Sequence, residues 1–391
     1  MEVAYPYVDV TVDLKGLTPV AVREPGVVAV VGMANAGPDE TPTVVDSIKG
    51  VKETFGDGGD LSPSLQLVLA QRPAASRVYG LKVKNDDEGG WRYAFSVLEG
   101  VKDVTFVGAA NRPIRQLAAG TLDVVALLKK HCEDASNDGS ARIAVSYIDP
   151  AIGRPGGKTY ADAVVPLADN YKSDQGRMIV FAARGATVDG GAKADVAAAG
   201  MSLIAGLRPE TSILLKQVLG LRLAPKEQFS SKEIKDLAAQ RIVPIIDPPF
   251  IPGGSLHLGE GTTLTDNDIL AYVDVVRLLD DMTYSLKANL IGLIGDARIT
   301  RSGLYAVQRT LEGVLDGYVL RQAITSYRIL IDLLQILEKP EGTWTQNERQ
   351  RVSAARNARN VAIEVLVVIG PAIHKIVVAL KPTYAMPEAT A

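Results

Sequence analysis

The best candidate for a phosphate-binding loop is the segment from Ile152 to Thr159, which comes after a predicted strand. A loop of that kind needs a glycine, four residues and then Gly-Lys-Ser/Thr, because the loop length decides where its backbone N–H groups point. Here only three residues separate Gly153 from Gly157, which precedes Lys158. The segment therefore favours a surface loop, and a P-loop-like nucleotide-binding enzyme is kept as the alternative function.

The histidines and the single cysteine do not form a recognisable catalytic or metal-binding pattern. His131, His257 and His374 are far apart, and none has the short His/Cys/carboxylate spacing of a zinc site. His131 is next to Cys132, but neighbouring helix residues point about 100° apart and do not readily form a nucleophile–base pair. We therefore predict no catalytic, cofactor-binding or metal site, although carboxylates from distant positions can still meet in the folded chain.

Apolar runs and helical patterns predict the elements that would position these residues. A continuous apolar run at 27–31 is typical of a buried strand. Further candidate strands, rich in apolar residues, lie at 77–83, 104–109, 142–148, 178–182 and 242–247. The spacing of Leu117, Leu122, Val125 and Leu128 predicts a helix ending near Lys129-Lys130. Strands that alternate with helices indicate an α/β layer on a largely parallel sheet.

A Pro/Gly-rich tract at 247–254 interrupts this alternation and is the predicted domain boundary. A capping box, Ser230–Glu233, opens a short helix before it. Two long helices are predicted after it, because apolar residues recur there at helical spacing. The positions are Ile269, Tyr272, Val273, Val276, Leu279 and Leu286, then Leu304, Val307, Leu311, Val314, Leu315 and Tyr318. We therefore expect an α/β domain at 21–250 and a second domain with long helices at 251–370.

Both ends of the chain contain β-like segments. Residues 8–14 alternate apolar and polar side chains, and prolines and glycines separate them from the apolar run at 27–31. Near the C-terminus, the apolar runs 361–369 and 373–380 flank Gly370-Pro371 in a hairpin-like pattern. Each end can fold back onto its own sheet or add a strand to a neighbouring molecule. The residues assigned to strand exchange are Val8, Val10, Val12, Leu14, Ile373, Ile376, Val378 and Leu380.

Composition bears on the partners. The net charge of −3 and the aromatic content of 5% argue against direct nucleic-acid binding. No uncharged apolar run reaches the ~18 residues of a membrane span, so we predict no membrane insertion. The single cysteine fits a reducing cytosol. One segment is concentrated in basic residues, and either a patch for an acidic partner or a solvated helix face explains it equally well. Its residues are Arg349, Arg351, Arg356 and Arg359.

The order of motifs resembles the contractile tail sheath proteins of phages and related injection machines. The likeness begins with the apolar strand, glycine and turn at 26–38, continues through Thr43–Ser47 to Glu53–Gly56, and extends to 64–70 and 77–83. It resumes at 98–110, 243–264, 273–278 and 361–379. In 243–264 the chain keeps the proline, glycines and Thr-Leu of the family's pattern but lacks its Trp and its Arg.

The resemblance implies a mixed α/β (α+β), two-domain sheath fold with extended β-arms at 1–20 and 371–391. In such a fold the domain at 21–250 would be the outer one, and the domain at 251–370 would be the inner one that faces the tube. Sheath subunits stack as hexameric rings in a helical lattice around an inner tube, exchange strands through their arms, and contract to drive the tube through a target envelope. The implied partners are other copies, the tail-tube protein, and baseplate and terminator or cap proteins. Assembly would occur in the cytoplasm of a prokaryotic host, in a virion tail or phage-tail-like particle. A tube or baseplate subunit is a further alternative.

Overall fold

The computed structural model describes Glu24 and residues 26–374. They form two compact units, each described by itself. Of the described residues, the sheet unit contains those up to Leu279 and 369–374, and the helical unit contains Asp280–Val368. The arm predicted at 1–20 lies outside the described residues, as does most of the arm at 371–391. The same holds for Val8, Val10, Val12, Leu14, Ile376, Val378 and Leu380.

The sheet unit contains an eight-stranded sheet in the order β2-β3-β1-β4-β5-β6-β7-β8. Its six central strands are parallel. They are β3 (Arg77–Lys82), β1 (Val27–Gly32), β4 (Phe106–Ala109), β5 (Ile143–Tyr147), β6 (Met178–Ala182) and β7 (Val243–Ile246). The short strands β2 (Thr43–Val44) and β8 (His257–Leu258) pair antiparallel at the two edges. The α/β fold class and the six strands expected from apolar runs are therefore confirmed.

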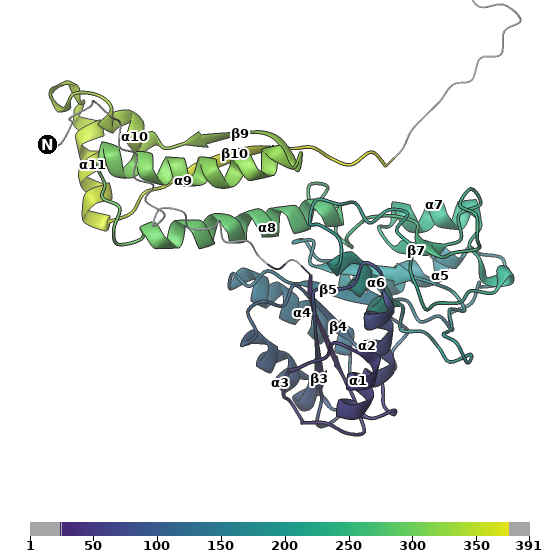
Figure 1. The fold of residues 1–391 in the computed structure, drawn as a ribbon. Helices are drawn as coiled ribbons and strands as arrows, with labels where there is room; N and C mark the ends of the chain where they lie inside the picture. Colours follow the sequence, from purple (N-terminus) through teal and green to yellow (C-terminus); the bar gives the residue numbers. More distant parts are fainter. Residues whose placement is uncertain (1–23, 25, 375–391) are drawn as a thin grey trace, which may run out of the picture. The chain divides into compact units, whose positions relative to one another are not determined.

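Helices cover both faces of this sheet, which explains why its strands are continuously apolar (Figure 1). On β1, Val28 and Val30 contribute to one core, whereas Val27, Ala29 and Val31 contribute to the other. The first face is covered by α1 (Ile48–Phe55), α2 (Leu61–Ala70) and α6 (Val196–Ala205). The second is covered by α3 (Glu88–Glu99), α4 (Val124–Asn137), α5 (Tyr160–Ala168) and α7 (Ser231–Ala239).

Helix α4 begins later and ends later than the apolar spacing predicted. The carboxylate of Asp123 accepts a hydrogen bond from Ala126 N at 3.0 Å and caps the first turn. Leu117 and Leu122 therefore belong to the preceding loop, and Lys129 lies in the middle of the helix. The helix stops at the Asn137-Asp138-Gly139 turn that the sequence indicated, where Gly139 has a φ of +88°.

The tract 247–254 connects β7 to its antiparallel neighbour β8, and so lies inside the sheet unit rather than between units. The division falls instead at Leu279/Asp280, within α8 (Val273–Leu290). A proline- and glycine-rich segment is equally suited to a surface loop within one sheet. Helix α8 also starts after Ile269 and Tyr272, which are exposed, so these two residues do not belong to its buried stripe.

The helical unit contains the second half of α8, then α9 (Arg301–Leu320), β9 (Ile324–Leu330), α10 (Asp332–Leu337), α11 (Gln346–Ala358) and β10 (Glu364–Ile369). The second predicted long helix is confirmed, because Leu304, Leu311, Val314, Leu315 and Tyr318 are buried along α9. Strand β10 pairs with β9 in a separate two-stranded sheet. The run at 361–369 therefore pairs with an earlier strand, which the hairpin interpretation did not foresee.

Candidate functional site

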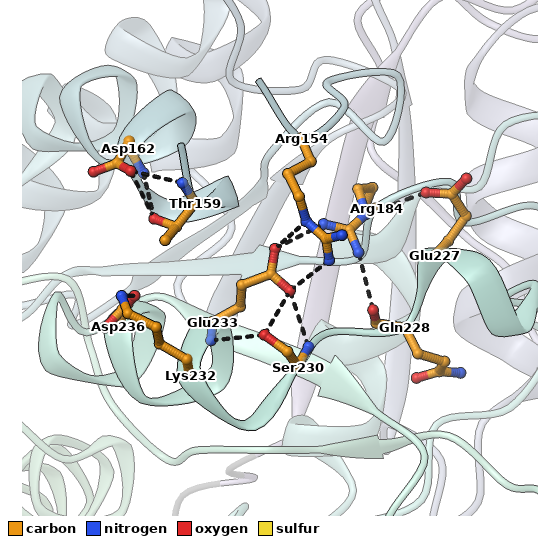
Figure 2. Close-up of polar contacts among 10 residues, drawn as sticks. All are labelled: Arg154, Thr159, Asp162, Arg184, Glu227, Gln228, Ser230, Lys232, Glu233 and Asp236. Atoms are coloured by element: carbon orange, nitrogen blue, oxygen red, sulfur yellow. Dashed lines mark hydrogen bonds and ion pairs between the residues drawn. The ribbon is translucent and has the colours of Figure 1, made fainter. Parts of the chain in front are cut away.

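The glycine-containing loop before α5 is tied to α7 by an ion pair. Arg154 donates from Nε and Nη2 to the two carboxylate oxygens of Glu233, each at 2.8 Å (Figure 2). This bidentate geometry is the strongest kind of arginine–carboxylate contact. The loop's basic residue next to the helix, Lys158, is exposed. The loop is thus anchored through Arg154.

The N-terminus of α5 already has a carboxylate of its own. Thr159 caps the helix, and Asp162 accepts from the Thr159 backbone N at 2.7 Å and from its hydroxyl at 2.8 Å (Figure 2). These hydrogen bonds lower the pKa of Asp162. A phosphate at this helix end would therefore meet a negative charge. Helix α5 forms although Pro166 lies inside it, since the capping box at its N-terminus offsets the cost of the proline.

Glu233 is the centre of a buried ion cluster at the ends of β5 and β6. Arg184 lies 3% exposed and donates to Glu233 at 3.2 Å, to Glu227 at 3.1 Å and to Gln228 O at 2.9 Å (Figure 2). Its guanidinium also lies over the rings of Tyr160 and Phe229. Burial alone would raise the pKa of Glu233, but hydrogen bonds from Arg154, Ser230 and Arg184 hold that pKa well below its usual range.

The topological switch point lies between β1 and β4, where doubly wound sheets usually bind ligands. Here the residues past the strand ends bind one another. Asn111 donates from its side chain to Asp60 at 2.9 Å and from its backbone to Asp195 at 3.0 Å. Arg112 pairs with Asp86 at 2.8 Å. Burial raises the pKa of Asp195 despite the hydrogen bonds that it accepts. Three carboxylates at this position make it unsuited to an anionic ligand.

His131 and Cys132 are both buried in the sheet unit and form no nucleophile–base pair. The ring of His131 stacks on Phe95 at 5.3 Å between centroids. Its Nε2 lies 2.8 Å from Nη1 of Arg142. A guanidinium only donates, so this ring nitrogen accepts and carries no proton. Burial raises the pKa of the Cys132 thiol to about 12, which makes it a poor nucleophile.

Within the described ranges, no group of three or more His, Cys, Asp or Glu residues is arranged to hold a metal ion. Among the helices described there, none is long and apolar enough to cross a membrane.

The basic segment lies on α11 and its C-terminal cap. The side chains of Arg349, Arg351, Arg356 and Arg359 are all exposed. Arg356 follows Arg349 by seven positions, or about two helical turns, which places them on the same side of the helix, whereas Arg351 points elsewhere and pairs with Asp332 at 3.0 Å. The helix packs through Val352, its one buried residue. The four arginines thus lie on an outward surface, and their partner stays a prediction.

The β9–β10 sheet exposes apolar side chains. Leu366 is 47% exposed and Val368 55% exposed, and both point to one side of β10 because they are two residues apart. Ile373, the one strand-exchange residue inside the described range, is 79% exposed and lies past the end of β10. In the described part of the chain this sheet has two strands, so each strand has one edge without a partner strand.

Sequence reasoning missed the partners in these clusters. The capping box identified Ser230 and Glu233, but Arg154 lies 79 residues from Glu233 and Arg184 lies 49 residues from it. No local pattern connects such residues. For Asp195, a signal existed: an aspartate directly before an apolar, alanine-rich run is typical of a helix N-cap.

This two-unit fold is similar along nearly its whole length to that of contractile sheath proteins. The helical sheath of the anti-feeding prophage in its contracted state matches with a TM-score of 0.66 and 14% identity, over 97% of this chain and 100% of that chain. The sheath complex of the PVC extracellular contractile injection system, also contracted, matches with a TM-score of 0.66 and 14% identity, over 98% and 99%. A sheath tail protein from Listeria innocua matches with a TM-score of 0.56 and 10% identity, over 81% and 90%.

No protein-family model matches the sequence, and no curated protein matches it either. The sheath fold expected from the sequence resemblance is therefore confirmed at the level of structure.

Proposed function

We propose that this chain is the sheath subunit of a contractile, phage-tail-like machine. The observation that carries the proposal is the match over 97–98% of the chain with solved sheath chains that are themselves covered over 99–100%. A doubly wound sheet alone hosts many functions. Similarity that includes the helical unit and its two-stranded sheet supports a common role much better than the sheet would.

Subunits would stack as hexameric rings around an inner tube and drive it through a target envelope on contraction. The partners are other copies of the chain, the tube protein, and baseplate and terminator or cap proteins. The particle is a virion tail or a phage-tail-like machine assembled in a prokaryotic cytoplasm. The energy for contraction would be stored as a free-energy difference of roughly a few kcal/mol per subunit between two packings of the same subunits. Because all subunits would switch cooperatively, this difference would be multiplied by the number of subunits in the sheath.

The β9–β10 sheet is the proposed acceptor of terminal strands from neighbours. A strand added at its edge would pair with free backbone groups and cover apolar side chains such as Leu366 and Val368, which are about half exposed. The donors would be 8–14, in which apolar and polar residues alternate, and the apolar run within 373–380. The helical unit, Asp280–Val368, would be the inner part that faces the tube, with the α11 arginines meeting an acidic surface.

Catalysis is not part of the proposed role. The carboxylate of Asp162 occupies the helix end at Thr159, and three further carboxylates, those of Asp60, Asp86 and Asp195, lie at the topological switch point. Both places would therefore repel the phosphates of a nucleotide. Calorimetric titration with ATP separates the alternatives. Tight binding that Lys158→Ala abolishes would favour the nucleotide-binding enzyme, and heats equal to buffer dilution in both proteins would support the sheath.

Negative-stain microscopy of the purified protein tests the proposal. We expect wide, helically ridged cylinders, alone or when tube protein is added. Narrow smooth tubes would indicate a tube subunit. Protein that stays monomeric at high concentration in the presence of tube would refute the assignment.

Deleting Met1–Gly16 tests the arms. The truncated subunit should keep its circular dichroism spectrum and lose polymerisation, because it has no strand to donate. Deleting 385–391, past the apolar run, is the matched control and should leave polymerisation intact. An unfolded Met1–Gly16 deletion would mean that this strand completes its own subunit.

A further inference from the structure

His374, at the C-terminal limit of the described residues, is docked on the sheet unit. Its Nε2 lies 2.8 Å from the hydroxyl oxygen of Ser212. Its Nδ1 lies 3.7 Å from Oε1 of Glu260. Its ring meets the edge of Tyr272 at 5.0 Å between centroids and 88° between planes. Each polar atom of the ring thus faces a polar side chain, and the ring itself covers an aromatic one.

The residues around His374 are held in place by the fold. Oε1 of Glu260 accepts from the backbone N of Gly261 at 3.0 Å, which turns the carboxylate toward the histidine. Val273 N donates to Gly261 O at 3.0 Å, and this joins the strand-like segment after β8 to the start of α8. The hydroxyl of Ser212 also accepts from Leu214 N at 3.3 Å. The contacts are therefore made to a preorganised surface.

Asp274 adds negative charge beneath this surface. It is 7% exposed, and within the described residues its Oδ1 has no hydrogen-bond partner. Burial raises its pKa, and backbone hydrogen bonds, together with the electrostatic interaction with His374, oppose that rise. A buried carboxylate oxygen without a donor favours a donating group beside it. Asp274 and Glu260 thus both offer carboxylate oxygens next to the imidazole.

The segment that leads to His374 contrasts with this docking. Ile373, directly before it, is 79% exposed, although it is strongly apolar. Between the end of β10 at Ile369 and His374, no helix or strand is formed. The imidazole ring of His374 therefore fixes this segment. Neither an apolar side chain nor a run of backbone hydrogen bonds does so within the described residues.

We propose that Ser212, Glu260 and Tyr272 form a socket that anchors the root of the C-terminal segment on its own subunit through His374. A strand donated to a neighbour then begins after His374, and this second part rests on the proposed function. The six residues 375–380 span at most about 20 Å when extended. The accepting strand of a neighbour must therefore end within that distance of the socket.

Hydrogen exchange followed by mass spectrometry on dilute, monomeric full-length protein tests the anchor. The variants are His374→Ala, Ser212→Ala and Glu260→Gln, and Ile373→Ala is the control because its side chain is exposed. Loss of a hydrogen bond of ordinary strength should speed exchange roughly three- to tenfold at the hydrogen-bonded amides around the socket, which are those of Leu214, Gly261 and Val273. The control should exchange as the wild type does. Unchanged exchange in His374→Ala would overturn the anchor, and the milder Glu260→Gln provides the test if that variant misfolds.

Assembly tests the second part separately. A chain ending at His374 should keep the wild-type exchange at the socket and fail to polymerise, since it holds the root but donates no strand. Polymers from this truncated chain would refute strand donation after His374. If the wild-type chain itself never polymerises, the proposed function fails, whereas the exchange data on monomers still decide the anchor.

Discussion

Acidification should destabilise the sheet unit through one buried histidine. His131 is 6% exposed and accepts a hydrogen bond from Arg142, which also donates to Leu98 O and Val101 O at 2.7 Å each. Burial, and then the charge of Arg142, lowers the pKa of His131 from 6.5 to about 4. Protonation in the folded state would place two positive charges against each other in the core.

The sign and size come from proton linkage. Below pH 6.5 the unfolded chain binds a proton at this histidine that the folded chain does not, so stability falls as pH falls. The stabilisation is complete above that pH and is lost as the pH drops toward about 4. A difference of this size corresponds to about 3 kcal/mol in total, of which about 2 kcal/mol is lost between pH 7 and pH 5.

Urea denaturation at pH 7 and pH 5 measures this loss. The two tryptophans lie one in each unit, so a Trp344→Phe background leaves Trp91, which packs 6.0 Å from Phe95, as the reporter of the sheet unit. His131→Gln keeps an acceptor for Arg142 but cannot take a proton. Between pH 7 and pH 5, the unfolding free energy of the parent protein should fall by about 2 kcal/mol more than that of the glutamine variant. Equal losses in both proteins would refute the reasoning.

Two further predictions concern stability at neutral pH. Glu233→Gln should lower the unfolding free energy of the sheet unit by about 3 kcal/mol, because two arginines lose the carboxylate that they share. Lys232→Ala, at an exposed neighbouring position, is the control and should change that free energy by less than about 0.5 kcal/mol. Similar urea midpoints for the two variants would contradict the role of the ion cluster. Gly200→Ala should cost about 1–3 kcal/mol, since a Cβ there would lie 2.4 Å from the ring of Phe181. At Gly313 on α9, a Cβ would meet no atom within 4 Å, so Gly313→Ala should instead stabilise the helical unit by about 0.5–1 kcal/mol. Thermal melts measure both variants. A stabilising Gly200→Ala and a destabilising Gly313→Ala would refute the packing argument.

The parallel strands could be predicted from sequence because burial on both faces leaves a continuous apolar run, as on β1 and β6. Helix α6 could not, since all ten of its residues are buried and no polar face marks a helical period. The start of α4 was misplaced because Leu117 and Leu122 happen to fit that period in a loop. Apolar spacing indicates burial, and the cap residue decides where the helix begins.

The candidate site was predictable only where its signals are local. Ser230 and Glu233 were found because a capping box occupies four consecutive residues. Arg184 and Arg154 reach the same carboxylate from other elements, and sequence periodicity contains no information on such distant pairs. The pairing of β10 with β9 was missed for the same reason, because the run after Gly370-Pro371 was the nearer partner in sequence.

The open β9–β10 sheet also affects how the protein must be produced. In the described residues, the edges of this sheet present backbone groups and half-exposed apolar side chains to any extended chain, including misfolded copies. Charged Glu364 and Arg328, both exposed on these strands, oppose such indiscriminate pairing only in part. Under the proposed function, ordered polymerisation and amorphous aggregation would compete for the same surface, and their rates would depend differently on concentration. Slow expression together with the proposed assembly partners should therefore yield more ordered particles than overexpression of the subunit alone.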